Sequence, residues 1–147
     1  MIYLDTSALI KRFVDEEGSL LVRSLVQQDS AVATAKLAYA EMFAGLTRKL
    51  RERNLSKAQY TLACRQFDRD WHAYIRVELG DDILGLARDL IQRHPLRGFD
   101  AVHLASALSL KTALGEEITF AAADGRLLKA AKAENLEPLN VETAPLS

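Results

Sequence analysis

Residues 1–10, MIYLDTSALI, decide the fold, because an apolar run ends there in an acid and two hydroxyl residues. Residues 2–4 are apolar or aromatic, which predicts a short buried strand. Asp5, Thr6 and Ser7 follow at once, and side chains of these types commonly begin helices. The stretch therefore predicts a strand that leads directly into a helix, with a carboxylate at the junction.

Short apolar stretches alternate with helical stretches along the rest of the chain. Further strands are expected at 31–34, 74–79, 118–122 and 136–140. Helices are expected at about 5–13, 19–28, 35–53, 56–72, 81–94, 99–114 and 125–134, with Ser19 and Ser56 as caps. Residues 143–147, TAPLS, are expected to form a loose tail. Strands separated by helices pair in parallel and are covered on both faces, so we expect one α/β domain over residues 1–147.

Composition limits the class of protein. The chain has 147 residues, with 19 Lys and Arg against 20 Asp and Glu, so any nucleic-acid contact must come from a local basic patch. One cysteine allows no internal disulfide and favours a reducing compartment. The start does not resemble a signal peptide, and no run reaches the roughly 20 apolar residues of a membrane span. We expect a soluble cytoplasmic protein without a membrane partner.

Four acids stand out by their context: Asp5, Glu41, Asp100 and Asp124. Two of them follow predicted strands, and Asp100 opens an apolar helix, so helix capping is the ordinary explanation for all three aspartates. Glu41 lies inside a long helix without a basic residue three or four positions away. Solvation is the usual explanation for such a glutamate, although its small neighbours would let another element approach closely.

The four acids are harder to explain together than singly. In an open parallel sheet, strand ends and helix starts share one edge, where ligands bind. Carboxylates that converge there repel one another unless a cation lies among them, and Mg²⁺ suits such oxygen ligands. A bound divalent ion activates water and stabilises charge on a phosphate. This pattern indicates a phosphodiester hydrolase that works without a catalytic histidine or serine.

The chain resembles the PIN-domain family and, within it, the toxins of bacterial VapBC toxin–antitoxin systems. The resemblance covers essentially the whole chain and rests on four segments: MIYLDTSALIKRF, AYAEMFAGL, LRGFDAVHLASAL and ITFAAADGRLLKAA. They place the family's acids on Asp5, Glu41, Asp100 and Asp124. The resemblance implies a three-layer α/β/α sandwich with a central parallel sheet.

What the resemblance implies about activity is specific. The expected protein is an Mg²⁺- or Mn²⁺-dependent endoribonuclease that hydrolyses RNA phosphodiester bonds with a metal-activated water. Asp5 and Asp100 are expected to bind the metal directly, and Glu41 and Asp124 to act through water or at a second ion. The implied partners are an RNA substrate, a cognate VapB-type antitoxin and a second copy of the chain in a homodimer.

Supporting residues are expected close to the acids. Thr6 and Ser7 can hydrogen-bond the carboxylates or the scissile phosphate, and Lys11 and Arg12 are candidates for phosphate contacts. The basic stretch at 47–54 is interpreted as a solvated helix end whose cations complement the helix dipole, with an RNA-backbone contact as the alternative.

Other chemistry-bearing residues have structural interpretations. His103, one turn after Asp100, is expected to be a structural residue or one that supports the site residues, because metal-assisted hydrolysis does not require a histidine base. Phe67 and Trp71 are four positions apart and are expected in the core or a dimer surface, with a groove that receives antitoxin side chains as the alternative.

Two other functions remain open. One is a non-catalytic protein-binding module with the same fold, and the other is a nuclease of this fold that acts on DNA or without an antitoxin. A phosphoryl-accepting domain of the haloacid-dehalogenase type is disfavoured, because it needs a second acid two positions after the first, where Ser7 stands.

Overall fold

The structure is a computed structural model that describes residues 1–29 and 31–143. The tail expected at 143–147 lies, apart from Thr143, outside these residues. Within the described part of the chain, no helix is both long and apolar enough to cross a membrane.

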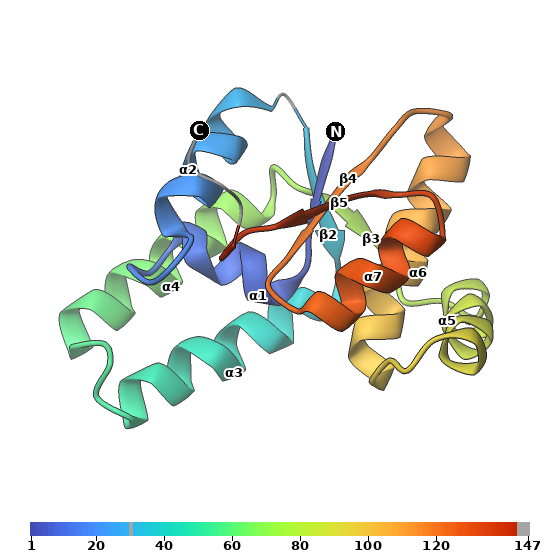
Figure 1. The fold of residues 1–147 in the computed structure, drawn as a ribbon. Helices are drawn as coiled ribbons and strands as arrows, with labels where there is room; N and C mark the ends of the chain where they lie inside the picture. Colours follow the sequence, from blue (N-terminus) through green and yellow to red (C-terminus); the bar gives the residue numbers. More distant parts are fainter. Residues whose placement is uncertain (30, 144–147) are drawn as a thin grey trace.

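A five-stranded parallel sheet forms the middle of the molecule (Figure 1). Its order is β3 (Ile75–Val77), β2 (Val32–Ala35), β1 (Ile2–Leu4), β4 (Thr119–Ala122) and β5 (Glu137–Asn140). Every pairing is parallel, and Tyr3 of β1 lies opposite Ala33 on one side and Phe120 on the other. Because β1 is the central strand, its carboxyl end places Asp5 in the middle of one sheet edge.

Helices cover both faces of the sheet (Figure 1). One face carries α1 (Thr6–Leu9), the short 3₁₀ helix η1 (Ile10–Arg12), α2 (Ser19–Gln28), α3 (Leu37–Arg51) and α4 (Lys57–Trp71). The other face carries α5 (Asp81–Arg93), α6 (Gly98–Leu114) and α7 (Gly125–Ala133). The predicted α/β fold with three layers is confirmed.

The alternation of β1 divides the core into two clusters. Ile2 and Leu4 point into the cluster under α1 to α4, and Tyr3 points into the cluster under α5 to α7. Phe67 and Trp71 are buried in the first cluster, which confirms their expected place in the core.

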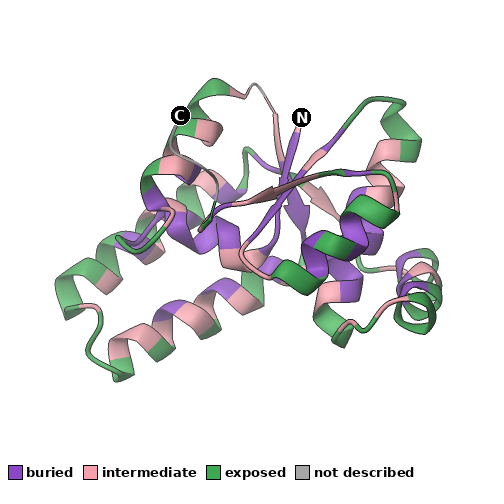
Figure 2. Cartoon of the chain, in the orientation of Figure 1, coloured by how far each residue is buried: buried purple, intermediate pink, exposed green. Residues whose placement is uncertain are grey.

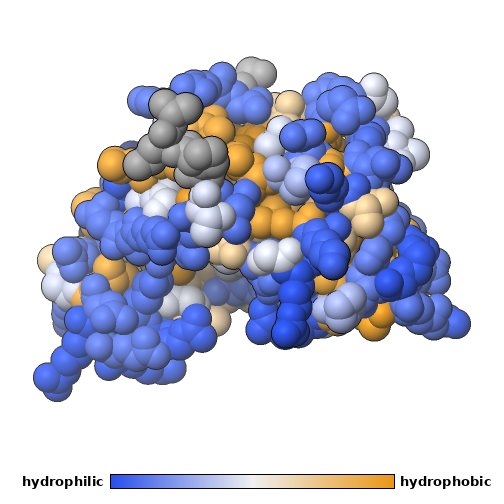
Figure 3. Space-filling model, viewed as in Figure 1, coloured by the Kyte–Doolittle hydropathy of each residue, from blue (hydrophilic) through white to orange (hydrophobic). Residues whose placement is uncertain are grey.

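Figure 2 shows buried residues along the sheet and the inner faces of the helices, and exposed residues on the outer faces. On the face of Figure 3, hydrophilic side chains dominate, with a hydrophobic area near the centre over β4 and β5.

One of the two expected serine caps is correct. Ser56 caps α4 in a reciprocal capping box with Gln59. Ser19 is instead the first residue of α2, and its hydroxyl bonds the preceding loop, donating to the Val14 carbonyl at 2.7 Å. The cap position belongs to Gly18, whose φ of +89° and close approach to the Val141 carbonyl no other residue would tolerate without strain.

Most predicted bounds differ from the observed ones by one or two residues, and two elements differ in a way that the structure explains. The expected helix at 5–13 is one α turn followed by η1, which alters the direction of the side chains after Leu9. The strand expected at 74–79 is only β3, because it pairs with β2 alone at the sheet edge. Neither difference changes the order of the elements.

Candidate metal centre

A cleft of about 530 Å³ opens at the carboxyl edge of the sheet, beside the end of β1. Asp5 reaches it from β1, Glu41 from α3 and Asp100 from α6. The structure therefore brings three of the four predicted acids to one place. The cleft wall also carries four basic residues: Lys11, Arg48, Lys49 and Arg97.

Asp5 both caps a helix and faces the cleft. It is 4% exposed, and its Oδ1 accepts hydrogen bonds from the Ser7 hydroxyl at 2.7 Å and the Ala8 amide at 3.0 Å. Within the described residues, Oδ2 accepts none, so its lone pairs remain available to a ligand. Burial raises the pKa of Asp5 above its ordinary value, and the charge of Asp100 adds to that rise against the opposing effects of His103 and the two hydrogen bonds. The capping explanation for Asp5 is confirmed, and the same side chain also lines the cleft.

Glu41 is held by a short chain of hydrogen bonds. Its Oε1 accepts from the Thr6 hydroxyl at 2.6 Å and lies 2.8 Å from Nε2 of His103. On the other side of the ring, Nδ1 of His103 lies 2.8 Å from the Tyr3 hydroxyl. Burial raises the pKa of Glu41, but the hydrogen bonds from His103 and Thr6 outweigh it, so the pKa lies below its ordinary value and the carboxylate is ionised at neutral pH.

Asp100 does not cap its helix, so the capping explanation is wrong for this residue. It lies in the first turn of α6, and its Oδ2 accepts from Nε of Arg97 at 3.2 Å. Nη2 of the same guanidinium lies 3.5 Å from Oδ2 of Asp124. Asp124 caps α7 through the Arg126 amide at 2.8 Å and lines a smaller neighbouring pocket with Asp100 rather than the main cleft. Arg97 thus stands between two of the predicted acids.

The residues present suit a divalent cation. Among the described residues, no three of the acids, histidines or cysteines lie close enough together to form a ready-made metal group. Mg²⁺ nevertheless needs only one or two carboxylates and keeps water for its other positions, and Asp5 and Asp100 are the two cleft carboxylates that could provide them. Asp100 contributes to the raised pKa of Asp5 and itself pairs with Arg97, as expected for carboxylates that are stabilised by a nearby positive charge.

The basic residues predicted to support the site are placed differently from expectation. Lys11 lines the cleft, but it is 2% exposed, and its ammonium lies 2.8 Å from Glu142 and 3.8 Å from Glu16. Arg12 lies outside the cleft, with Nη2 3.7 Å from Asp70 of α4, so the prediction that it lies beside the acids is wrong. Lys11 and Arg12 are consecutive residues of η1, so their side chains point about 120° apart and only one of them faces the cleft.

The basic end of α3 is nearer the site than predicted. Arg48 and Lys49 line the cleft, whereas the sequence was interpreted there as a solvated helix end. They follow Glu41 by two helical turns and therefore share its face, a signal that helical spacing carries. Gly45 lies on the same face, between Glu41 and Arg48. A Cβ at this position would lie 3.1 Å from the side chain of Ile10, so another element does approach closely there, as the small residues beside Glu41 predict.

Comparisons with known proteins agree with this arrangement. A family model of the PIN domain matches residues 2–133. Ribonuclease VapC45 of Mycobacterium tuberculosis is 37% identical over 110 residues, covering 75% of this chain and 76% of its own. Among solved structures, FitAcB from Neisseria gonorrhoeae matches with a TM-score of 0.68 at 14% identity, covering 98% of this chain and 100% of that one.

A toxin–antitoxin complex from Klebsiella pneumoniae matches with a TM-score of 0.64 at 16% identity, covering 96% of this chain and 98% of that one. These two structural likenesses support the fold alone. The family match covers residues 2–133, which include all four acids, and the identity to the mycobacterial ribonuclease extends over three quarters of the chain. This chain belongs to the PIN-domain family.

Proposed function

We propose that the protein is a divalent-metal-dependent endoribonuclease and the toxin of a VapBC-type toxin–antitoxin pair. The observation that carries the proposal is the convergence of Asp5, Glu41 and Asp100 on one cleft at the carboxyl edge of the sheet. The 37% identity to a protein named as a ribonuclease supports RNA as the substrate. We further propose that residues 1–147 act as one domain.

Asp5 and Asp100 would hold the cation, which we propose to be Mg²⁺ or Mn²⁺, and Glu41 and Asp124 would act through water or at a second ion. The bound ion would lower the pKa of a water molecule and offset charge on the phosphate. Glu41 is ionised and fixed through Oε1, so its Oε2 can accept a proton from an attacking water. Ser7 keeps the Asp5 carboxylate in place from the protein side.

Substrate binding is proposed on the α3 wall of the cleft. Arg48 and Lys49 face the cleft and can contact phosphates of the RNA backbone, which contribute affinity without sequence choice. Lys49 lies 3.3 Å from Glu16, an exposed contact that a phosphate can replace. This local patch resolves the difficulty that a chain with a net charge of −1 binds a polyanion.

The proposed protein partners are a cognate VapB-type antitoxin and a second copy of the chain. The structural neighbour from Klebsiella pneumoniae is a toxin–antitoxin complex, which supports the first. Exposed apolar side chains at Leu84, Ile91 and Phe99 support the second, because grouped apolar side chains on a surface mark protein contacts. Since RNA is the proposed substrate, we propose a cytoplasmic location.

The proposal is tested by cleavage of a pool of structured RNAs and, in parallel, of single-stranded and duplex DNA. Wild type with Mg²⁺ or Mn²⁺ is compared with wild type in EDTA, with Asp100→Asn, and with Asp89→Asn as a control on the exposed face of α5. RNA cleavage that is lost in EDTA and in Asp100→Asn but kept in Asp89→Asn is the expected result. Cleavage of DNA alone would support the DNA nuclease, and no cleavage by any sample would support the protein-binding module.

A further inference from the structure

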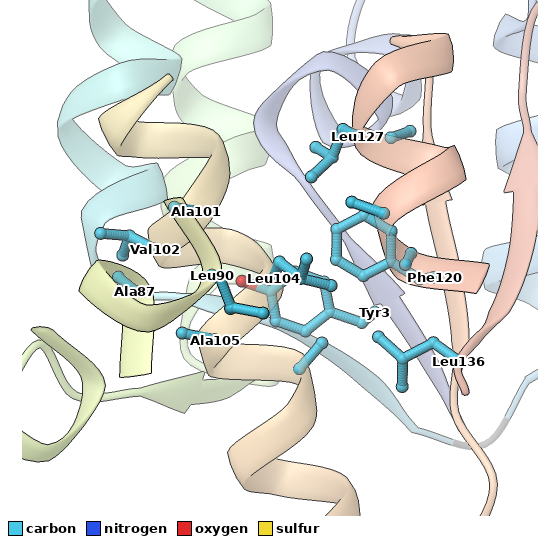
Figure 4. Close-up of a cluster of buried hydrophobic side chains, with 14 of the residues drawn as sticks. Tyr3, Ala87, Leu90, Ala101, Val102, Leu104, Ala105, Phe120, Leu127 and Leu136 are labelled. Atoms are coloured by element: carbon cyan, nitrogen blue, oxygen red, sulfur yellow. The ribbon is translucent and has the colours of Figure 1, made fainter. Parts of the chain in front are cut away.

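Tyr3 carries a buried hydroxyl whose position is not explained by packing alone. The ring is fully buried and stacks on Phe120, with ring centroids 5.4 Å apart and an interplanar angle of 6°. Figure 4 shows the ring among the apolar side chains of Phe120, Leu104 and Leu90. A phenylalanine would satisfy these contacts equally, so the hydroxyl has a separate role.

The hydroxyl bonds a second buried residue, His103. It lies 2.8 Å from Nδ1 of that ring, and His103 is 2% exposed. A tyrosine hydroxyl carries its proton at neutral pH, and at this distance it can donate a hydrogen bond to Nδ1. A neutral imidazole that accepts at Nδ1 carries its own proton at Nε2.

A proton at Nε2 lets His103 donate a hydrogen bond to the Glu41 carboxylate. Nε2 lies 2.8 Å from Oε1 of Glu41 and 3.2 Å from the Thr6 hydroxyl. In the other tautomer, the Nε2 lone pair would face the carboxylate oxygen, and an attraction would become a repulsion. The choice of tautomer therefore decides whether His103 holds Glu41 or pushes it away.

We propose that Tyr3 is a positioning residue, which fixes the His103 tautomer and through it the orientation of the Glu41 carboxylate in the cleft. The juxtaposition joins three distant parts of the sequence, since the Tyr3–His103 contact spans 100 residues and the His103–Glu41 contact spans 62. The consequence for cleavage rests on the proposed function, whereas the tautomer itself does not.

The chain provides a matched control in Tyr74. Its side chain is also buried, and within the described residues its hydroxyl has no hydrogen-bond partner. Tyr74→Phe and Tyr3→Phe remove the same atom from two buried tyrosines, but only the second breaks a hydrogen bond. A general effect of losing a buried hydroxyl would appear in both variants.

The experiment measures the tautomer directly and the cleavage rate separately. Long-range ¹H–¹⁵N spectra distinguish ring nitrogens that carry a proton, and a chain with three histidines can be assigned with His72→Asn and His94→Asn. Wild type and Tyr74→Phe are expected to show a single Nε2–H tautomer at His103. Tyr3→Phe is expected to show a mixture, together with a changed carboxyl ¹³C shift of Glu41.

The cleavage rate should fall only in the variant whose His103 tautomer changes. Tyr3→Phe is expected to lower kcat about 10- to 100-fold, as loss of an outer hydrogen bond to a site residue commonly does, with KM unchanged because no substrate contact is lost. In a His103→Ala background, Tyr3→Phe should cause no further loss, since both changes break one chain.

Three outcomes would overturn the proposal. They are an unchanged His103 tautomer in Tyr3→Phe, a changed tautomer with unchanged Glu41 shift and kcat, or an equal loss in Tyr74→Phe. A wild-type protein that cleaves no RNA would instead count against the proposed function, and the tautomer and Glu41 spectra would still decide this inference.

Discussion

Nε of Arg97 lies 3.2 Å from Oδ2 of Asp100, so the protein's own cation already occupies one side of a proposed metal ligand. The side chain of Arg97 is 83% exposed, and its guanidinium also reaches toward Asp124 at 3.5 Å. Because it is so exposed, the Arg97 guanidinium can move away from Asp100 at a small cost in free energy. A divalent cation that binds Asp100 must therefore compete with Arg97 rather than enter an open site.

Removal of Arg97 should strengthen metal binding. Arg97→Gln is expected to bind Mn²⁺ about 1.4- to fivefold more tightly, because an exposed ion pair is worth about 0.2–1 kcal/mol. Isothermal titration calorimetry measures the affinity, with Arg88→Gln of α5 as an exposed control. Equal or weaker binding by Arg97→Gln would show that the arginine does not compete with the metal.

Asp5→Asn should separate stability from metal binding. An asparagine still caps α1 and accepts from Ser7 and Ala8, while it removes a buried charge that Asp100 repels. Without metal, the variant is expected to melt about 2–4 °C higher, which corresponds to about 1 kcal/mol in a chain of this length. Added Mn²⁺ should raise the melting temperature of the wild type only, as differential scanning calorimetry can establish. A wild-type shift retained in Asp5→Asn would exclude Asp5 as a ligand.

Glu134 should stabilise the contact between the C-terminal ends of α7 and α5 in a pH-dependent manner. Its carboxylate lies 2.7 Å from Nε2 of His94 and 3.0 Å from Nη2 of Arg93, and the hydrogen bond from His94 is the main cause of a lowered pKa. A lowered pKa means that the stabilisation is present above the ordinary carboxyl pKa and is lost as the pH falls through the lowered value.

Glu134→Gln is therefore expected to lose about 1 kcal/mol in free energy of unfolding at neutral pH, and nothing in acid below the pKa of Glu134. Urea unfolding at both pH values measures the difference, with Glu137→Gln at an exposed position as the control. A deficit that is the same at both pH values would mean that the charge of Glu134 contributes nothing.

Arg48 should contribute to RNA affinity but not to chemistry. Arg48→Gln is expected to weaken RNA binding and to reduce the slope of log affinity against log salt by about 1, with kcat unchanged. Binding can be followed by fluorescence anisotropy across a salt series, with Arg65→Gln on the exposed face of α4 as the control. An unchanged salt slope would remove Arg48 from the RNA-binding surface.

The sequence predicted the architecture because local signals agreed with one another. The three central strands are short and mostly apolar runs, each followed by a helical stretch, and Ser56 with Gln59 forms a capping pattern that the structure repeats. The Ser19 cap failed because the decisive factor was not local. Gly18 is required by contact with Val141, which lies more than a hundred residues away.

The site was predictable to the extent that backbone position determines it. Asp5 and Asp124 follow strands and Asp100 opens a helix, so their edge of the sheet followed from topology. Contacts between side chains did not follow from topology. Arg97 between Asp100 and Asp124, and the hydrogen bonds from Tyr3 through His103 to Glu41, depend on which side chains meet across the edge.

The central claim is that the acids at this edge form one metal-dependent site for RNA cleavage. The most direct measurement is the RNA cleavage rate across a Mn²⁺ titration for wild type and Asp5→Asn, with circular dichroism to establish that both are folded. The account predicts a rate that rises from zero to a plateau in wild type and stays at zero in the folded variant. Cleavage by wild type without metal, or an undiminished plateau in Asp5→Asn, would contradict it.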